Sequence, residues 1–202
     1  MIYSVRRVPA EGVVADVSNF HSTGVFARPE TVFRVTHSDE GLRIRFDVKD
    51  SFVRSVCTER NGPVCKDSCV EFFFQPEGSA GYVNIEVNPC GTSHISYIRD
   101  WRRVPGGFAD RTFPDASDIR IRTSHSGTIE PEIAADWFAV IEVPYTFMER
   151  VWGTEFNRRR FKANFYKCGD ETSHPHWAAW SPIGEKLNFH APEYFGVLEL
   201  ED

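Results

Sequence analysis

Apolar and polar residues alternate along most of the chain. The pattern is clearest over residues 42–49, where Leu, Ile, Phe and Val alternate with Arg, Asp and Lys. Side chains of a strand point alternately to the two faces of its sheet, so this segment predicts a strand with one buried and one solvent-facing side. Residues 31–36 predict a partner strand, and the Ser-Asp-Glu-Gly sequence between the two segments predicts a turn.

Short strands separated by turn residues continue to the C-terminus. Seven further strands are predicted, at Ser68–Phe74, Tyr82–Asn88, Thr92–Ile98, Asp118–Ser124, Trp137–Val143, Arg160–Lys167 and Phe195–Leu200. One short helix is predicted at Tyr145–Val151, directly after Pro144. Many short strands with such turns indicate a sandwich or a barrel. We therefore predict an all-β fold, an antiparallel β-sandwich of the jelly-roll or immunoglobulin-like kind, as a single domain over residues 1–202.

Three long segments show no periodic pattern: Asp50–Asp67, Arg99–Ser117 and Cys168–Tyr194. Loops of this length are uncommon in compact domains unless they serve a function. The last segment is the most unusual of the three, because it holds two tryptophans, three histidines and several prolines.

Charge and hydropathy narrow the classes of partner. The formal net charge is −6, and the only basic run is the short cluster at residues 158–160. Nucleic-acid-binding proteins concentrate basic residues on one face, so no nucleic acid is expected as a partner. No segment approaches the roughly 18 apolar residues that span a membrane, and no signal peptide is visible. The expected location is cytoplasmic, or secreted if a leader was removed.

The cysteines suggest free thiols. There are five, at positions 57, 65, 69, 90 and 168, so they cannot all pair within one chain. Cys65 and Cys69 lie four residues apart, which is not the C-x-x-C spacing of common metal and redox motifs. Buried free thiols in a reducing compartment are therefore expected.

Polar side chains recur on one predicted side of the sheet. Glu71 lies opposite the apolar residues of its strand, and the next strand carries a polar row of Asn84, Glu86 and Asn88. Asn164 adds a polar position on a later strand. Carboxylates and amides together suit hydroxyl groups, because each hydroxyl both donates and accepts a hydrogen bond. An ordinary solvent-facing side of a sheet would show the same pattern.

Trp177 and Trp180 are candidate ligand contacts in the last long loop. A flat indole can cover the apolar C–H face of a pyranose ring while the hydroxyls of the sugar reach polar neighbours. The alternative is that one or both indoles close the open end of the sandwich.

Signals for metals and catalysis are weak. His174, His176 and His190 lack a recognised zinc spacing, and nothing specifies a calcium site, although loop oxygens would suffice for one. Glu71 and Glu86 resemble a glycosidase pair only in being two carboxylates, because they would share one sheet face instead of flanking a bond. No cofactor is expected.

Four segments resemble motifs of family 9 carbohydrate-binding modules and the related DOMON-like sandwiches, and they occur in the family's order. They are Lys66–Phe74 (D-x-x-V-E-h-F), Tyr82–Thr92 (ending V-N-x-x-G-T), Trp137–Pro144 (W-x-V-E-I-P) and Asn188–Leu200 (H-x-P-x-x-F-G-x-L). The similarity extends from about Thr31 to the C-terminus.

This resemblance implies a sandwich that binds sugars, at polysaccharide chain ends or as small saccharides. It implies that Glu71 is the carboxylate of the binding face, with Glu86 and Asn88 as further polar contacts. The stacking indole would be Trp177 or Trp180. Such modules are commonly attached to glycoside hydrolases, and some contain structural calcium.

Two positions depart from the family pattern. Cys65 stands where members that clamp a sugar between two rings have an aromatic residue, and Glu86 stands where the residue can be basic. These departures leave the two-sided clamp and the identity of the sugar open.

The leading hypothesis is a non-catalytic carbohydrate-binding module. Its predicted site comprises Trp177, Trp180, Glu71, Glu86, Asn88 and Asn164, with Arg60, Asn61 and Arg99 from the rim loops. A second hypothesis is a glycoside hydrolase, or a domain associated with one, that uses Glu71 and Glu86. A third is a haem-binding DOMON-like domain, which needs axial ligands and has only Met1 and Met148 as methionines.

Overall fold

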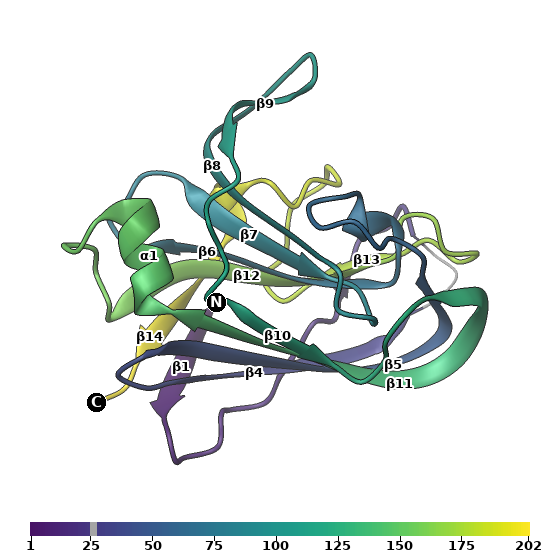
Figure 1. Ribbon diagram of the computed structural model, residues 1–202, viewed down its shortest axis with the longest axis horizontal. Helices are drawn as coiled ribbons and strands as arrows, with labels where there is room; N and C mark the ends of the chain where they lie inside the picture. The colour runs from purple at the N-terminus through teal and green to yellow at the C-terminus, as the bar shows by residue number, and fades with distance from the viewer. Residues whose placement is uncertain (25–27) are drawn as a thin grey trace.

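The computed structural model describes residues 1–24 and 28–202, which fold into two packed β-layers (Figure 1). The described residues form fourteen strands in one continuous sheet that folds over on itself. The strand order is β10-β11-β5-β4-β1-β14-β12-β6-β7-β8-β9, and the short strands β2, β3 and β13 lie off this path.

The first layer is the lower one in Figure 1. It contains β1 (Ile2–Arg7), β2 (Ala15–Asp16), β4 (Glu30–His37), β5 (Gly41–Ser55), β10 (Arg120–Thr123) and β11 (Ile129–Pro144). The helix α1 (Tyr145–Trp152) follows β11 directly.

The second layer carries the residues of interest. It contains β3 (Asn19–Phe20), β6 (Cys69–Pro76), β7 (Tyr82–Val87), β8 (Ser93–Val104), β9 (Gly107–Thr112), β12 (Arg160–Cys168), β13 (Trp177–Ala179) and β14 (Gly196–Leu200). Two 3-10 turns, Val64–Lys66 and Pro192–Tyr194, lie in the neighbouring loops.

Strand β1 joins the two layers. Its first part pairs in parallel with β14, and Arg6 and Arg7 pair in parallel with β4. The sheet is therefore mixed, whereas most other neighbouring strands are antiparallel, as the sequence predicts.

Aromatic side chains fill the space between the layers. Phe33 of β4 stacks on Phe165 of β12, with ring centroids 3.7 Å apart and an interplanar angle of 17°. Both rings are fully buried, and burial of one such side chain contributes about 1.5–3 kcal/mol to folding. This contact fixes the two layers face to face.

The predicted sandwich is confirmed, and the predicted helix is present and extends one residue further, to Trp152. All three segments that we expected to be irregular are partly strands, and the third, Cys168–Tyr194, contains β13. Residues 50–55 belong to β5, and residues 99–112 form most of the β8–β9 hairpin, which projects from the body in Figure 1. The hairpin escapes a periodicity search because charged residues occupy both of its sides, so no apolar alternation marks it.

Candidate functional site

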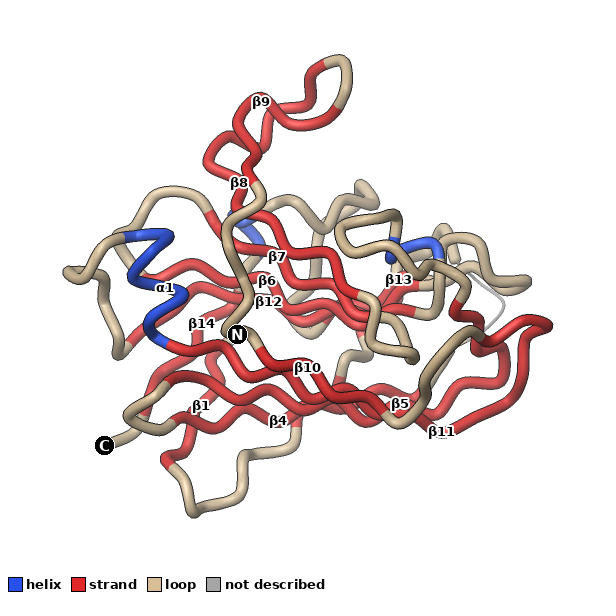
Figure 2. Tube along the Cα trace, viewed as in Figure 1, coloured by secondary structure: helices blue, strands red, loops and turns tan. Residues whose placement is uncertain are grey.

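The site lies on the face of the second layer that points away from the core. Side chains of β6 point alternately to the two sides of the sheet. Val70, Phe72 and Phe74 point into the core. Cys69, Glu71 and Phe73 point to the other side. We call this other side of β6, β7, β8 and β12 the outer face. Figure 2 shows the loops that gather beside it.

The outer face is covered by other parts of the chain, so the alternative of an ordinary solvent-facing side does not hold. A second hydrophobic cluster lies on it, made of Phe73, Tyr82, Ile98, Tyr166, Ala179 and Ile183. Phe189 and Phe195, from the loop before β14, pack against this cluster. Alternation correctly separates the two sides of a strand, but it does not reveal that a distant loop folds over the polar side.

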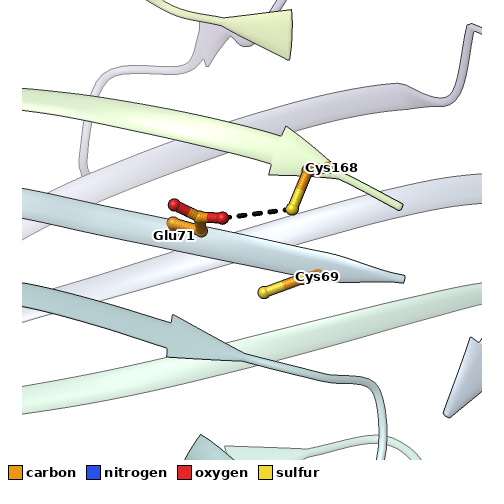
Figure 3. Close-up of side chains that lie close together, drawn as sticks. All are labelled: Cys69, Glu71 and Cys168. Carbon is orange, nitrogen blue, oxygen red and sulfur yellow. Dashed lines mark hydrogen bonds between the residues drawn. The ribbon is translucent and has the colours of Figure 1, made fainter. Parts of the chain in front are cut away.

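Glu71 of β6 and Glu86 of β7 occupy directly paired positions on the outer face. Their exposed fractions are 3% and 7%. Glu71 accepts a hydrogen bond of 3.1 Å from the Cys168 thiol (Figure 3), and Glu86 accepts one of 2.8 Å from the Asn84 amide. In the part of the chain that the structure describes, no Lys, Arg or His lies within ion-pair distance of either carboxylate.

The environment favours the neutral forms of both acids. Burial raises the pKa of Glu71 well above its usual value, and the neighbouring Glu86 raises it further. Burial also raises the pKa of Glu86, to about 7, although the hydrogen bond from Asn84 opposes the shift. Strongly shifted acids of this kind are typical of functional sites.

Two other buried acids differ from Glu71 and Glu86 because each is paired with a cation. Asp67 accepts a hydrogen bond of 2.9 Å from Arg54, and Asp50 lies 3.2 Å from the ammonium of Lys167. A buried carboxylate is costly unless it is paired, so these two acids are compensated within the fold. Among the residues that the structure describes, Glu71 has no such cation.

Thiols surround Glu71. Cys69 and Cys168 sit at paired positions of β6 and β12, and both are free and buried. In Figure 3 both sulfur atoms lie near the Glu71 carboxylate. Burial raises the pKa of Cys69 to about 12, so this thiol keeps its proton at neutral pH.

Aromatic and polar side chains form the rim of this site. Trp177 of β13 is paired with Cys168 of β12, so its half-buried indole lies on the outer face. The indole N–H donates a hydrogen bond of 2.7 Å to Asp170. Phe189 and Cys65, also half-buried, pack against the same thiol cluster.

Comparison with known families supplies the deciding observation. The model of the family described as carbohydrate-binding family 9 matches residues 13–200. The chain belongs to carbohydrate-binding family 9. The resemblance that the four motifs indicate is thereby confirmed.

Solved structures agree with the assignment to family 9. A candidate carbohydrate-binding protein from Bacteroides uniformis ATCC 8492 is 29% identical, with a TM-score of 0.84 and 99% of each chain covered. Two family 9 modules from Caldicellulosiruptor kristjanssonii, in complex with glucose and with cellotriose, are each 12% identical, with TM-scores of 0.61 and 0.59. The matches cover 100% of this chain and 96% and 94% of theirs, and at this identity they show a common fold.

A search of the curated proteins gives no match. Among the described residues of this family 9 chain, no helix has the length and apolar character to cross a membrane.

Trp180 is not part of the outer face of the family 9 fold. It is 4% exposed and packs in the core, with its ring 5.8 Å from Phe33 and 5.7 Å from Phe165. Trp180 lies three positions after Trp177, and two side chains an odd number of positions apart along an extended segment point to opposite faces. Only Trp177 therefore remains as a stacking candidate.

Asn88 and Asn164 hold the fold together through hydrogen bonds to other parts of the chain. The Asn88 amide donates to Asp67 at 3.0 Å, and its carbonyl accepts from the backbone of Thr92 at 2.9 Å. Asn164 exchanges two hydrogen bonds of 2.9 Å with the backbone of Ser181. Both side chains are fully buried, so neither is free to contact a sugar in this structure.

The three rim residues predicted from the loops do not gather around Glu71. The side chain of Asn61, which adopts a left-handed φ of 61°, accepts a hydrogen bond of 2.9 Å from the backbone of Ile95 and thus anchors its loop. Arg60 is exposed. Arg99 is also exposed and lies over Tyr97, which faces the core side of β8.

Sequence reasoning did not assign Asp170 or Phe189 to the candidate site, and it noted Cys65 only as a departure from the family pattern. All three residues lie outside the strands, where no periodicity indicates which way a side chain points. His190 accompanies them, 2.8 Å from the Tyr82 hydroxyl, and burial lowers its pKa to about 3. The one available signal was that Phe189 and His190 stand inside the closing motif of the family.

Proposed function

We propose that this family 9 domain binds carbohydrate on its outer face and is not itself an enzyme. One observation carries the proposal: Glu71 and Glu86 are buried side by side with no cationic partner among the described residues. Sugar hydroxyls are neutral donors that satisfy such oxygens without adding charge. A hydroxylated ring at the rim would therefore compensate two groups that the fold leaves uncompensated.

Trp177 is the proposed stacking platform. Its indole is half-buried on the same face as Glu71, and its N–H is held by Asp170, which fixes the plane of the ring. A ligand would be covered from one side, because Cys65 stands where a second ring would be needed for a clamp. One-sided stacking predicts weaker binding than a two-sided clamp gives.

The structural neighbours suggest which sugars to test first. The two Caldicellulosiruptor kristjanssonii modules share the fold and have glucose and cellotriose bound. Glucose and short β-glucans are thus the first candidates for this chain. A natural role would be to bring an attached or associated glycoside hydrolase to its substrate.

Catalysis by Glu71 and Glu86 is not supported. A glycosidase needs its two carboxylates on either side of the scissile bond, one as acid and one ionised. Here both acids stand in one row of one sheet face, and burial raises the pKa of each. We expect no release of aryl groups from aryl glycosides.

The haem hypothesis is also unsupported. Met148 is a residue of α1 whose side chain is fully buried in the core, and Met1 is a terminal residue with 63% exposure. Neither methionine lies among the residues of the outer face. We expect no Soret band in the absorbance spectrum of the purified protein.

Calorimetry and NMR titration with glucose, cellobiose, cellotriose and xylo-oligosaccharides test the proposal. Glu71→Gln replaces one acceptor oxygen by a donor at nearly constant shape, so we expect affinity to fall at least about tenfold, or ~1.4 kcal/mol. Glu193→Gln, an exposed position in the loop before β14, is the matched control. Equal binding by wild type and Glu71→Gln would contradict the assigned site, and no binding of any sugar would contradict the function.

A further inference from the structure

The cysteines of this chain are unevenly distributed. Cys69 and Cys168 form the centre of one buried cluster, and Cys57 and Cys65 pack against it. Only Cys90 lies elsewhere, so four of the five cysteines belong to or pack against one cluster, and two of them, Cys69 and Cys168, lie beside Glu71. Sugar binding by the outer face does not require this convergence.

We propose that Cys69, Cys168 and Glu71 form a binding site for a zinc-like divalent cation. One ligand atom from each residue, two sulfurs and a carboxylate oxygen, lies within 4.8 Å of the other two. All three side chains are buried, and they come from adjacent strands, β6 and β12, which hold them rigidly. Thiolate with carboxylate is a donor set that suits Zn²⁺.

The separations fit a tetrahedral site after small side-chain movements. With Zn–S bonds of about 2.3 Å, two sulfur ligands of a tetrahedron stand roughly 3.8 Å apart. The Cys168 sulfur already lies 3.1 Å from a Glu71 oxygen, and all separations in the set are within 4.8 Å. Rotation about side-chain bonds can remove a difference of this size without moving the strands.

Charge balance favours a cation at this place. Glu71, Glu86 and Asp170 gather around the thiols, and none of them forms an ion pair with a basic residue of the described chain. When the cation binds, each thiol and the neutral carboxyl of Glu71 give up a proton to solvent and become anionic ligands. The two positive charges of the metal then offset two of the three new negative charges, and the Glu71 carboxylate gains the cationic partner that it lacks.

Two half-buried residues lie next to the three proposed ligands. Cys65 and Asp170 lie half-buried at the rim, and the Cys65 carbonyl accepts a weak hydrogen bond of 3.6 Å from the Cys168 thiol. Three protein ligands leave one position of a tetrahedral zinc for solvent. This position faces the proposed sugar site, because Glu71 belongs to both.

The metal site does not depend on the proposed sugar-binding function, although the two share Glu71. Metal and sugar should compete, since the same carboxylate oxygens cannot serve both at full strength. A bound metal is therefore expected to weaken sugar affinity, and a chelator to restore it.

Cobalt titration of the reduced full-length chain tests the site without any sugar. Thiolate ligation gives Co²⁺ a charge-transfer band in the near ultraviolet, and tetrahedral geometry gives strong visible bands. We expect one equivalent to saturate both and Zn²⁺ to abolish them. Cys69→Ser and Cys168→Ser should each lose at least half of the charge-transfer intensity, whereas Cys90→Ser should keep all of it.

The outcomes separate the two proposals. No cobalt band in wild type, or an equal loss in Cys90→Ser, overturns the metal site whatever the sugar data show. Glu71→Gln, which keeps both thiols, provides a variant in case the serine variants do not fold; an unchanged metal affinity in it would also overturn the site. Sugar binding measured with excess chelator tests the outer-face function alone.

Discussion

Glu71 and Glu86 stand directly opposite each other on β6 and β7, both buried, and no cation of the described chain pairs with either. Like charges at directly opposite positions destabilise a sheet, so ionisation of both acids would lower the stability of the folded state. The folded state keeps the acids largely neutral, which makes its stability depend on pH.

Replacement of Glu86 by Gln should remove part of this pH dependence. The folded pKa of Glu86 is raised from 4.5 to about 7. Its contribution to stability is therefore complete below pH 4.5 and is lost as the pH rises through 7. Relative to Glu86→Gln, wild type should lose about 2–3 kcal/mol between pH 5 and 8, because a tenfold change in proton affinity corresponds to about 1.36 kcal/mol. Urea unfolding at several pH values measures the difference.

The comparison of wild type with the variant is essential here. Burial lowers the pKa of His176 to about 4 and that of His190 to about 3, so these histidines make the fold more stable as the pH rises toward 6.5. Their contribution cancels in the difference between the two proteins. Glu199→Gln, at an exposed position of β14, should leave the pH profile unchanged. A pH-independent difference between wild type and Glu86→Gln would show that Glu86 titrates normally.

The fold was largely predictable because period-two alternation directly reports strands with one apolar side. The strand at residues 42–49 illustrates this, and its partner, β4, was found in the same way. The first strand, β1, was missed because only Tyr3 and Val5 of its six residues are buried. The β8–β9 hairpin was missed because its distal part has no buried side.

The site was only partly predictable. Alternation placed Glu71 and Glu86 in one row, and the structure brings them together. Alternation could also have placed Trp180 on the opposite face from Trp177, since the two residues are three positions apart. The burial of Asn164 could not be foreseen, because its partner, Ser181, lies in a loop whose path follows from tertiary packing.

The two tryptophans should behave in opposite ways when each is replaced by Ala. Trp177→Ala removes the proposed platform, so sugar affinity should fall at least about tenfold, at a cost of about 1–2 kcal/mol in stability. Trp180→Ala empties a core position and should cost about 3–5 kcal/mol of unfolding free energy. The milder Trp180→Phe should bind sugar as wild type does. Unchanged affinity in Trp177→Ala would refute the platform.

Asn164 should prove to be structural. Its amide and carbonyl both bond to the backbone of Ser181, and removing them leaves buried groups without partners. Asn164→Ala should therefore lower the free energy of unfolding by about 2–3 kcal/mol. Lys162→Ala, at an exposed position of the same strand, should change it by less than about 0.5 kcal/mol. Thermal unfolding of both variants measures the change in the free energy of unfolding. A stable Asn164→Ala protein with impaired sugar binding would show that Asn164 contacts the sugar.

Asp50 and Lys167 form a buried ion pair in which each charge compensates the other. Their charged groups lie 3.2 Å apart at 0% exposure, and the Lys167 ammonium also donates a hydrogen bond of 2.7 Å to His176. Burial raises the pKa of Asp50, but the charge of Lys167 and the hydrogen bond from the Phe52 backbone together with smaller contributions outweigh it, so the pKa lies below its ordinary value. Asp50→Asn strands a buried positive charge and should cost about 3–5 kcal/mol in urea unfolding.

The exposed pair of Lys49 and Glu30, 3.1 Å apart, provides the matched control. Glu30→Gln should cost less than about 1 kcal/mol, because water and salt screen an exposed pair. Adding Lys167→Met to Asp50→Asn should recover part of the lost stability, since the stranded charge is then gone. If Asp50→Asn were as mild as Glu30→Gln, the buried pair would contribute nothing beyond a surface contact, and Lys167 would have to find compensation elsewhere.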